Sequence, residues 1–323
     1  MKNYIAVLLL ILTSCDFRIH TNSDITVNIQ ARESIDEKTR NIIAEKNQFV
    51  VDCIQKKKSN EISKIASENL INEGFNDVIP ILDFYGSLMK SNEFHVFGEF
   101  HAESSESNVQ IEIEENFNRG GDTNKFELRY RSLAEETFLT LLNLNIGSSE
   151  ILITTLYGNY NREWELDFLS VSTFTSYGLT SPEFYYRSQK YHNDGDIVNA
   201  YVFSLFAELT MEPCEGVFYY DVREDIIEHS KSIRSEFEQK FVLPDTLFSI
   251  KTQPIIAGLG IRIGPQLDYL PWVQYYTLID TSNEENIRTE RMEVAKQIES
   301  IFPGINQNFK TQIYQAYQPE LKR

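Results

Sequence analysis

The hydrophobic residues of this chain change their spacing at Phe94. Before this position they recur every three or four residues, which is the repeat of an amphipathic helix. This pattern predicts three helices, over residues 34–58, 62–74 and 76–88. After Phe94 apolar and polar residues alternate, as in strands with one buried face. A block of helices followed by a block of strands indicates an α+β fold, with three helices packed on a curved antiparallel sheet.

The alternating segment predicts six strands in one antiparallel meander. The last three cover residues 136–146, 150–158 and 163–174. One face of the first three is apolar and should line the hollow between sheet and helices: Phe94, Val96, Phe100, Val109, Ile111, Ile113, Phe126, Leu128 and Tyr130. On the opposite, solvent-facing side we expect Glu112 and Glu114 beside Arg129 and Arg131, because opposite charges on neighbouring strands attract.

A helical hairpin is expected over residues 181–211. Pro182 suits the first turn of a helix, and Gly195 interrupts the pattern before the second helix. Ala200 and Ala207 have the small side chains that a close contact between helices needs. The spacing resembles one tetratricopeptide repeat (TPR) at Tyr191, Gly195, Asp196, Ala200, Ala207 and Pro213.

The remaining chain predicts a second α+β unit. Strands are expected near residues 246–252, 255–263, 269–279 and 310–317, with helices over 226–241 and 282–301. Gly258 and Gly260 invite comparison with a phosphate-binding loop, but such a loop links a strand to a helix. Apolar residues continue through these glycines and Pro265 follows, so a bulged strand is the better interpretation.

Residues that could bind a metal are scattered. His95 and His101 lie six positions apart in a predicted strand, about 20 Å from each other, so they cannot share an ion and should be solvated. Asp194 and Asp196 lack the other ligands of a calcium loop. We expect no metal and no cofactor, and no nucleophile or phosphate-loop motif is present in the sequence.

The N-terminus resembles a bacterial export signal. An apolar run over residues 4–12 follows Lys2 and is too short to span a bilayer, which needs about 20 residues. The segment 12–15, Leu-Thr-Ser-Cys, resembles the lipobox of bacterial lipoproteins. The resemblance implies a signal peptide over 1–14 and a lipid with palmitate-type chains on Cys15. An ordinary cleaved signal and a buried N-terminal helix are the alternatives.

Residues 15–33 are polar and lack a repeat, which is typical of a flexible tether. Asp16 follows the lipidated position and resembles an inner-membrane retention signal in enteric bacteria, but sorting rules differ between lineages. The predicted location is therefore the cell envelope, with inner or outer membrane left open.

The two other cysteines, Cys53 and Cys214, are predicted to be free thiols, although an exported protein permits a disulfide between them. The chain has 30 basic and 48 acidic residues and a formal net charge of −18. Such a surface repels nucleic acid. The expected partners are the membrane, reached through the lipid, and an envelope protein or a small ligand.

Three short segments, 164–169, 195–200 and 301–304, resemble those of a family of uncharacterised bacterial lipoproteins. The resemblance implies an NTF2-like domain over 34–178, in which helices fill the hollow of a curved sheet. A TPR-like hairpin over 179–214 and a C-terminal α+β domain over 215–323 would follow. The NTF2-like fold hosts enzymes and binding modules alike, so the fold does not decide the function.

The expected function is a non-catalytic, lipid-anchored binding module. One alternative is a hydrolase or isomerase that uses His101, Tyr157 and Asp167 in the hollow, and convergence of the three in one pocket would favour it. A second alternative is a structural spacer, which predicts no pocket and no large exposed apolar patch. If Trp164 and Phe168 face the hollow, alternation turns Asp167 outward. We therefore expect the hollow to hold no catalytic pair.

Overall fold

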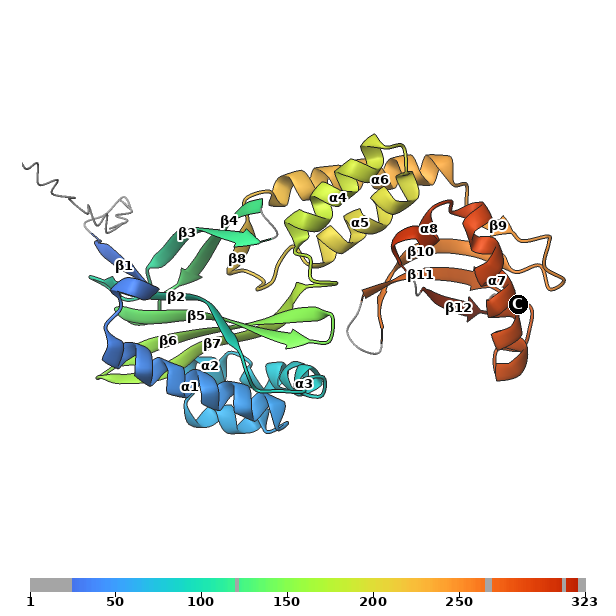
Figure 1. Cartoon of the computed structure of the whole chain (residues 1–323). Helices are drawn as coiled ribbons and strands as arrows, with labels where there is room; N and C mark the ends of the chain where they lie inside the picture. Colours follow the sequence, from blue (N-terminus) through green and yellow to red (C-terminus); the bar gives the residue numbers. More distant parts are fainter. Residues whose placement is uncertain (1–24, 120–121, 265–268, 310–311, 319–323) are drawn as a thin grey trace, which may run out of the picture.

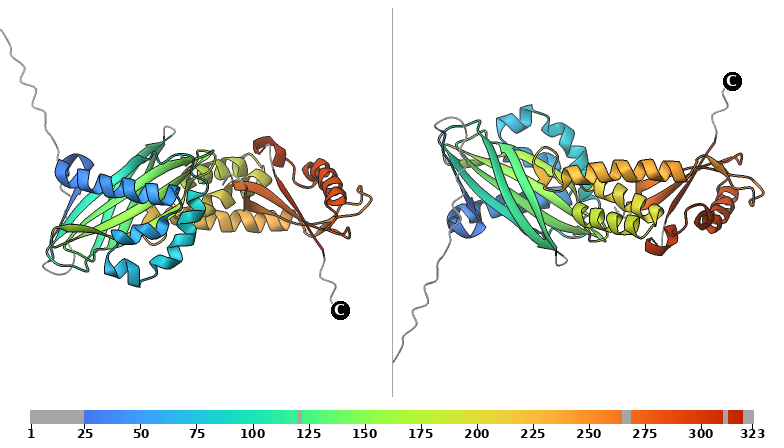
Figure 2. Two further views of the ribbon diagram at one scale, coloured as in Figure 1. Left: turned by 90° about the horizontal axis from the view of Figure 1, so that it is seen from below. Right: turned by 90° about the horizontal axis from the view of Figure 1, so that it is seen from above.

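The computed structural model describes residues 25–119, 122–264, 269–309 and 312–318, so Cys15 and the predicted signal peptide lie outside the described residues. The molecule is elongated, with a sheet-rich N-terminal part, a middle layer of helices and a smaller C-terminal sheet (Figure 1). Views from below and above show the same arrangement (Figure 2). Helices and mainly antiparallel sheets confirm the α+β class. Within the described ranges no helix has the length and apolar character to cross a membrane.

A layer of helices covers one face of the first sheet. Its members are α1 (Glu37–Gln55), the 3-10 helix η2 (Ser59–Lys64), α2 (Glu68–Asn72) and α3 (Phe75–Gly86). Helix α1 begins after Asp36, whose side chain accepts a hydrogen bond from the Thr39 backbone N–H at 2.9 Å. Such a cap satisfies a donor that the first turn leaves open. Ser34, the expected start, instead belongs to the 3-10 turn η1 (Arg32–Ser34).

The first sheet has five antiparallel strands in the order β1-β2-β5-β6-β7. These strands are β1 (Val27–Ala31), β2 (His95–Ser104), β5 (Glu136–Ile146), β6 (Ser149–Tyr160) and β7 (Glu163–Thr175). The assignment of residues 15–33 to a tether is wrong for β1, which pairs with β2. Val27 and Ile29 alternate with polar residues and pack against the core, so this short strand carried a period-two signal.

The expected six-strand meander is also wrong, because a hairpin leaves it. Strands β3 (Gln110–Arg119) and β4 (Asp122–Arg131) pair with each other and then with β8 (Phe218–Tyr220) in a separate three-stranded sheet. This sheet packs on the face of the first sheet opposite the helices. The physical reason is that β5 and β6 are buried on both faces and need two covering layers.

The nine residues expected in one hollow are therefore divided between two cores. Phe94 and Val96 pack against the core beneath the helices. The core between the two sheets contains Phe100, Ile111, Ile113, Phe126, Leu128 and Tyr130. Val109 is buried beside β3. The outer face of the hairpin agrees with expectation: Glu112 pairs directly with Arg129, and Glu114 and Arg131 are exposed on the same side.

The predicted helical hairpin is confirmed. It consists of α4 (Ser181–Asn193) and α5 (Ile197–Leu209), and α6 (Arg223–Lys240) packs on α5. The hydroxyl of Ser188 donates to the Ala200 carbonyl, and that of Ser181 donates to the Ala207 carbonyl, both at 2.7 Å. These hydrogen bonds require the close approach that the two small alanine side chains allow.

The C-terminal sheet has the order β12-β11-β10-β9. Its elements are β9 (Asp245–Thr246), β10 (Ile255–Ile263), β11 (Tyr269–Tyr276), α7 (Glu284–Ile301), α8 (Ile305–Asn308) and β12 (Ile313–Tyr317). The expected bulge lies between Ile256 and Gly258, as the bulged-strand interpretation requires. The strand expected over 246–252 is reduced to two residues. This sheet shares one hydrophobic core with α4, α5 and α6. The hairpin and the C-terminal unit, which were expected to be separate domains with a boundary at residue 214, therefore pack as one body.

Gly86 gives a test of the contact between α1 and α3. A Cβ at this position would overlap the backbone carbonyl oxygen of Ile54, which cannot move as a flexible side chain could. We expect Gly86→Ala to lower the free energy of unfolding by about 1 to 3 kcal/mol, as overpacking does. Alanine otherwise favours a helix over glycine by about 1 kcal/mol, so a loss can be ascribed to the overlap.

The matched control is Gly258→Ala, because a Cβ at Gly258 meets nothing within 4 Å. Urea denaturation of both variants measures the difference. A Gly86→Ala variant as stable as Gly258→Ala would show that the two helices do not approach as closely as described.

Candidate functional site

A buried polar cluster lies between α1 and the first sheet. Asn47 is on the buried face of α1, one turn after Ile43. Its Oδ1 accepts hydrogen bonds from the Thr155 hydroxyl and the Tyr157 hydroxyl, both at 2.9 Å. Burial raises the pKa of Tyr157 far above its ordinary value. Tyr157 is therefore a fixed donor within the core rather than a group that exchanges protons near neutral pH.

His101 is buried, which corrects the expectation of a solvated histidine. A bulge between Val96 and Gly98 shifts the register of β2, so His95 and His101 face opposite sides of the sheet. His95 is exposed, whereas only 5% of His101 is exposed. Nε2 of His101 lies 2.9 Å from Oε1 of Glu136.

Asp167 is buried as well, with 7% of its surface exposed, so the expectation that it faces outward into solvent is wrong. It is the extra residue of a bulge in β7, since Leu166 pairs with Tyr157 and Phe168 with Leu156. Trp164 and Leu166 pack towards the helices as expected. After the bulge, Phe168 packs on the opposite face.

The partner of Asp167 is a tyrosine, and the expected absence of a catalytic pair did not foresee a pair of this kind. The Tyr160 hydroxyl donates to Oδ2 of Asp167 at 2.9 Å. A side chain at Gly158 would overlap the same oxygen, so glycine leaves the space for the carboxylate. Burial raises the pKa of Asp167, although hydrogen bonds from Ser67 and Tyr160 lower it. Burial and the Asp167 charge raise the pKa of Tyr160.

The three residues proposed for an enzyme do not converge. In the sheet register, Phe138 lies between His101 and Tyr157. Two strand spacings separate their backbones, about 10 Å. Each candidate has its own partners: Glu136 for His101, Asn47 for Tyr157, and Tyr160 for Asp167.

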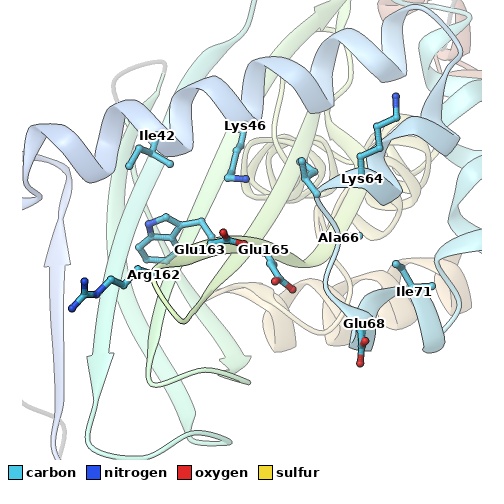
Figure 3. A pocket seen from close by; sticks show the side chains of 11 residues that line it. Ile42, Lys46, Lys64, Ala66, Glu68, Ile71, Arg162, Glu163 and Glu165 are labelled. Atoms are coloured by element: carbon cyan, nitrogen blue, oxygen red, sulfur yellow. The ribbon is translucent and has the colours of Figure 1, made fainter.

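A cavity of about 510 Å³ opens beside this sheet, between α1, the segment from η2 to α2, and the β6–β7 turn (Figure 3). It is lined by Ile42, Lys46, Lys64, Ile65, Ala66, Glu68, Ile71, Arg162, Glu163, Trp164 and Glu165. Asn161 and Arg162 both have positive φ, 55° and 74°. This is the conformation of a tight two-residue hairpin turn, so Arg162 lies at the tip and Glu163 begins β7 beside it. In Figure 3, Lys46 extends from α1 towards this turn.

No sequence pattern indicates this cavity, because its walls come from three distant segments. The predicted turn between residues 158 and 163 is confirmed, but its neighbours in space could not be read from the chain. Neither Asp167 nor Tyr160 lines the cavity.

The described cysteines are not reactive groups. Cys53 and Cys214 are both buried and free, which confirms the favoured interpretation over a disulfide. Burial raises the pKa of Cys53, and it raises the pKa of Cys214 to about 11. A buried thiol with a raised pKa is a poor nucleophile and a poor metal ligand.

A comparison of the chain with known protein families, with characterised proteins and with solved structures finds no match. The resemblance to a lipoprotein family therefore stays a prediction from the sequence.

Because the pKa of Asp167 is raised, we expect the stability of the fold to depend on pH. Its pKa in the folded chain lies above the ordinary 3.8, so the folded state holds this proton more tightly than the unfolded state does. The stabilising contribution is present below pH 3.8 and is lost as pH rises through the folded pKa. We expect Asp167→Asn, which stays neutral and can still hydrogen-bond to Tyr160, to melt at a higher temperature than the wild type at pH 7. That advantage should shrink towards pH 3.8.

Thermal unfolding from pH 7 to pH 4 measures this effect, with Glu163→Gln, an exposed carboxylate nearby, as the control. An Asp167→Asn difference that stays constant with pH would contradict a buried, charged carboxylate.

Proposed function

We propose that the chain is a non-catalytic binding module of the bacterial cell envelope, held at a membrane by a lipid on Cys15. The motif Leu-Thr-Ser-Cys at 12–15 and the apolar run before it support the anchor. A single acyl chain binds membranes only marginally. The anchor therefore depends on the diacylglycerol that the lipobox resemblance implies.

The cavity beside α1 supports the binding role. Ile42, Ala66 and Ile71 give it apolar walls, and Ile71 is 43% exposed. Lysine, arginine and glutamate side chains surround them, so charges of both signs face an incoming ligand. No histidine, cysteine, serine, threonine or tyrosine is among the described residues that line it. Apolar walls with charges of both signs around them suit a polar ligand or a peptide segment of an envelope protein.

The proposal includes an NTF2-like fold for the first domain and a TPR-like hairpin after it. Helices on one face of a bulged antiparallel sheet are consistent with an NTF2-like first domain, with the second sheet as an addition to that plan. Helices α4 and α5 are consistent with one TPR-like hairpin, which serves here as a packing element because α6 and the C-terminal sheet cover it.

One observation favours the alternative of a hydrolase or isomerase. Asp167 is buried and pairs with the half-buried Tyr160, and the pKa values of both groups are raised, a combination that is common in active sites. A hydrolytic activity on ester or peptide substrates that Asp167→Asn abolishes, with the fold retained, would favour this candidate over the first.

The anchor is tested by Cys15→Ser. We expect the wild-type chain in the membrane fraction at the mature size, and the variant either released or retained at precursor size, because serine cannot accept the lipid through sulfur. Cell fractionation with labelled fatty acid measures both properties. Identical soluble behaviour of the two chains, at mature size and without label, would rule out the lipoprotein.

The binding site is tested by Ile71→Glu, which places a charge on the apolar wall of the cavity. We expect this variant to lose a partner or ligand that the wild-type chain captures from solubilised envelope. Ile81→Glu is the matched control, because Ile81 is 49% exposed and does not line the cavity. Capture that is equal for both variants would place binding elsewhere.

A further inference from the structure

A second polar group lies where β1, β2 and β5 meet. His101, Glu103 and Glu136 each bring one ligand atom to within 4.8 Å of the others. We propose that these three side chains bind a divalent transition-metal ion, and that Zn²⁺ fits them best. This site is separate from the cavity assigned to ligand binding, whose lining contains none of the three.

The strand register fixes the positions of the ligands. Glu103 and Glu136 are directly paired across β2 and β5, and His101 lies two residues before Glu103 on the same face of β2. Like charges directly opposite one another destabilise a sheet. A bound cation between the two carboxylates would offset that repulsion.

The imidazole is held in the orientation that a metal ligand needs. Nδ1 of His101 faces Oε1 of Gln30 at 3.3 Å, and an amide oxygen only accepts hydrogen bonds. A proton on Nδ1 would fit this oxygen and would leave Nε2 facing Glu136. Metal-binding histidines generally donate their other N–H to an oxygen in this way. The contact between Nε2 and Glu136 is then made through a second proton or through a cation.

Other contacts hold the group in place. The Asn159 amide donates to Oε2 of Glu136 at 2.6 Å and leaves Oε1 for the ion. The Trp164 ring packs edge-on against His101, with 6.1 Å between the centroids. The imidazole is thus buried and oriented, while the two carboxylates are reached from solvent: the Glu136 side chain is 34% exposed and Glu103 is exposed.

The donor set selects the class of metal. One imidazole nitrogen and two carboxylates suit Zn²⁺, Mn²⁺ or Fe²⁺, whereas Ca²⁺ and Mg²⁺ prefer oxygen ligands alone. Zn²⁺ binds more tightly than Mn²⁺ or Fe²⁺ to a given site. Three protein ligands leave a fourth position of the tetrahedron for water.

The chain contains its own control pair. Nε2 of His192 lies 2.7 Å from Oε2 of Glu236, a similar histidine–glutamate contact on the surface. Within the described part of the chain this pair belongs to no three-residue ligand group of the same kind. If the His101 group were a simple ion pair, substitutions there and at His192 would have the same effect on Zn²⁺ binding. If it is a metal site, only substitutions in the His101 group should weaken binding.

The experiment is calorimetric titration of Zn²⁺ into the purified full chain after chelator treatment. We expect one site that Glu103→Gln and Glu136→Gln each weaken by more than about 100-fold. Gln30→Leu, which removes the amide whose oxygen faces Nδ1, should weaken it by about 10- to 100-fold. His192→Gln should leave the affinity unchanged. Far-UV circular dichroism checks that each variant is folded, and Glu103→Gln alters only an exposed side chain.

Several outcomes would overturn the proposal. Zn²⁺ binding that is absent from the wild type, or unchanged in both glutamate variants, excludes this ligand set. An equal loss in His192→Gln would indicate surface binding, and tighter binding of Ca²⁺ than of Zn²⁺ would contradict the metal class. Co²⁺ in place of Zn²⁺ adds a spectroscopic check, because a thiolate-to-cobalt band would assign the ion to a cysteine.

Discussion

Burial of both faces of β5 and β6 is the constraint on which the N-terminal part of this molecule depends. Adjacent residues such as Leu141 and Leu142 point to opposite sides, and both are fully buried. Each such side chain contributes about 1.5 to 3 kcal/mol when it leaves water. One covering layer can exclude water from only one face of the sheet. Helices therefore cover one face, and the β3–β4–β8 sheet covers the other. The two cores, and the polar groups trapped at their edges, follow from this sandwich.

Local patterns predicted much of the fold correctly. The long helix of residues 37–55, the hairpin of residues 181–209 and the charged face of β3 and β4 each follow from a regular repeat that local chemistry reinforces. The errors arise where one residue is added to a strand. Bulges near Phe97 and at Asp167 reverse the facing of every residue beyond them. A bulge leaves the composition unchanged, so alternation alone could not reveal it.

The polar sites were harder to predict for a different reason. His101, Tyr157 and Asp167 are all polar residues of the first sheet, yet strand pairing gives each of them a separate set of partners. The cavity and the His101 group draw on segments from Gln30 to Glu165, and such distant residues meet only through the order of strands in the sheet. The alternation of apolar and polar residues could not specify that order. It shows that the β3–β4 hairpin has one apolar face, but it does not show which sheet that face packs against.

The position of β8 has a consequence for how the chain reaches its native state. The strand that completes the second sheet lies beyond both helices of the α4–α5 hairpin, although its partner β4 ends at Arg131. A chain that emerges N-terminus first must hold the β3–β4 hairpin with an open edge until Phe218–Tyr220 arrives. Open strand edges and distant contacts slow folding and invite association with other chains. During synthesis, this open edge is a surface at which the incomplete sheet can pair with another chain.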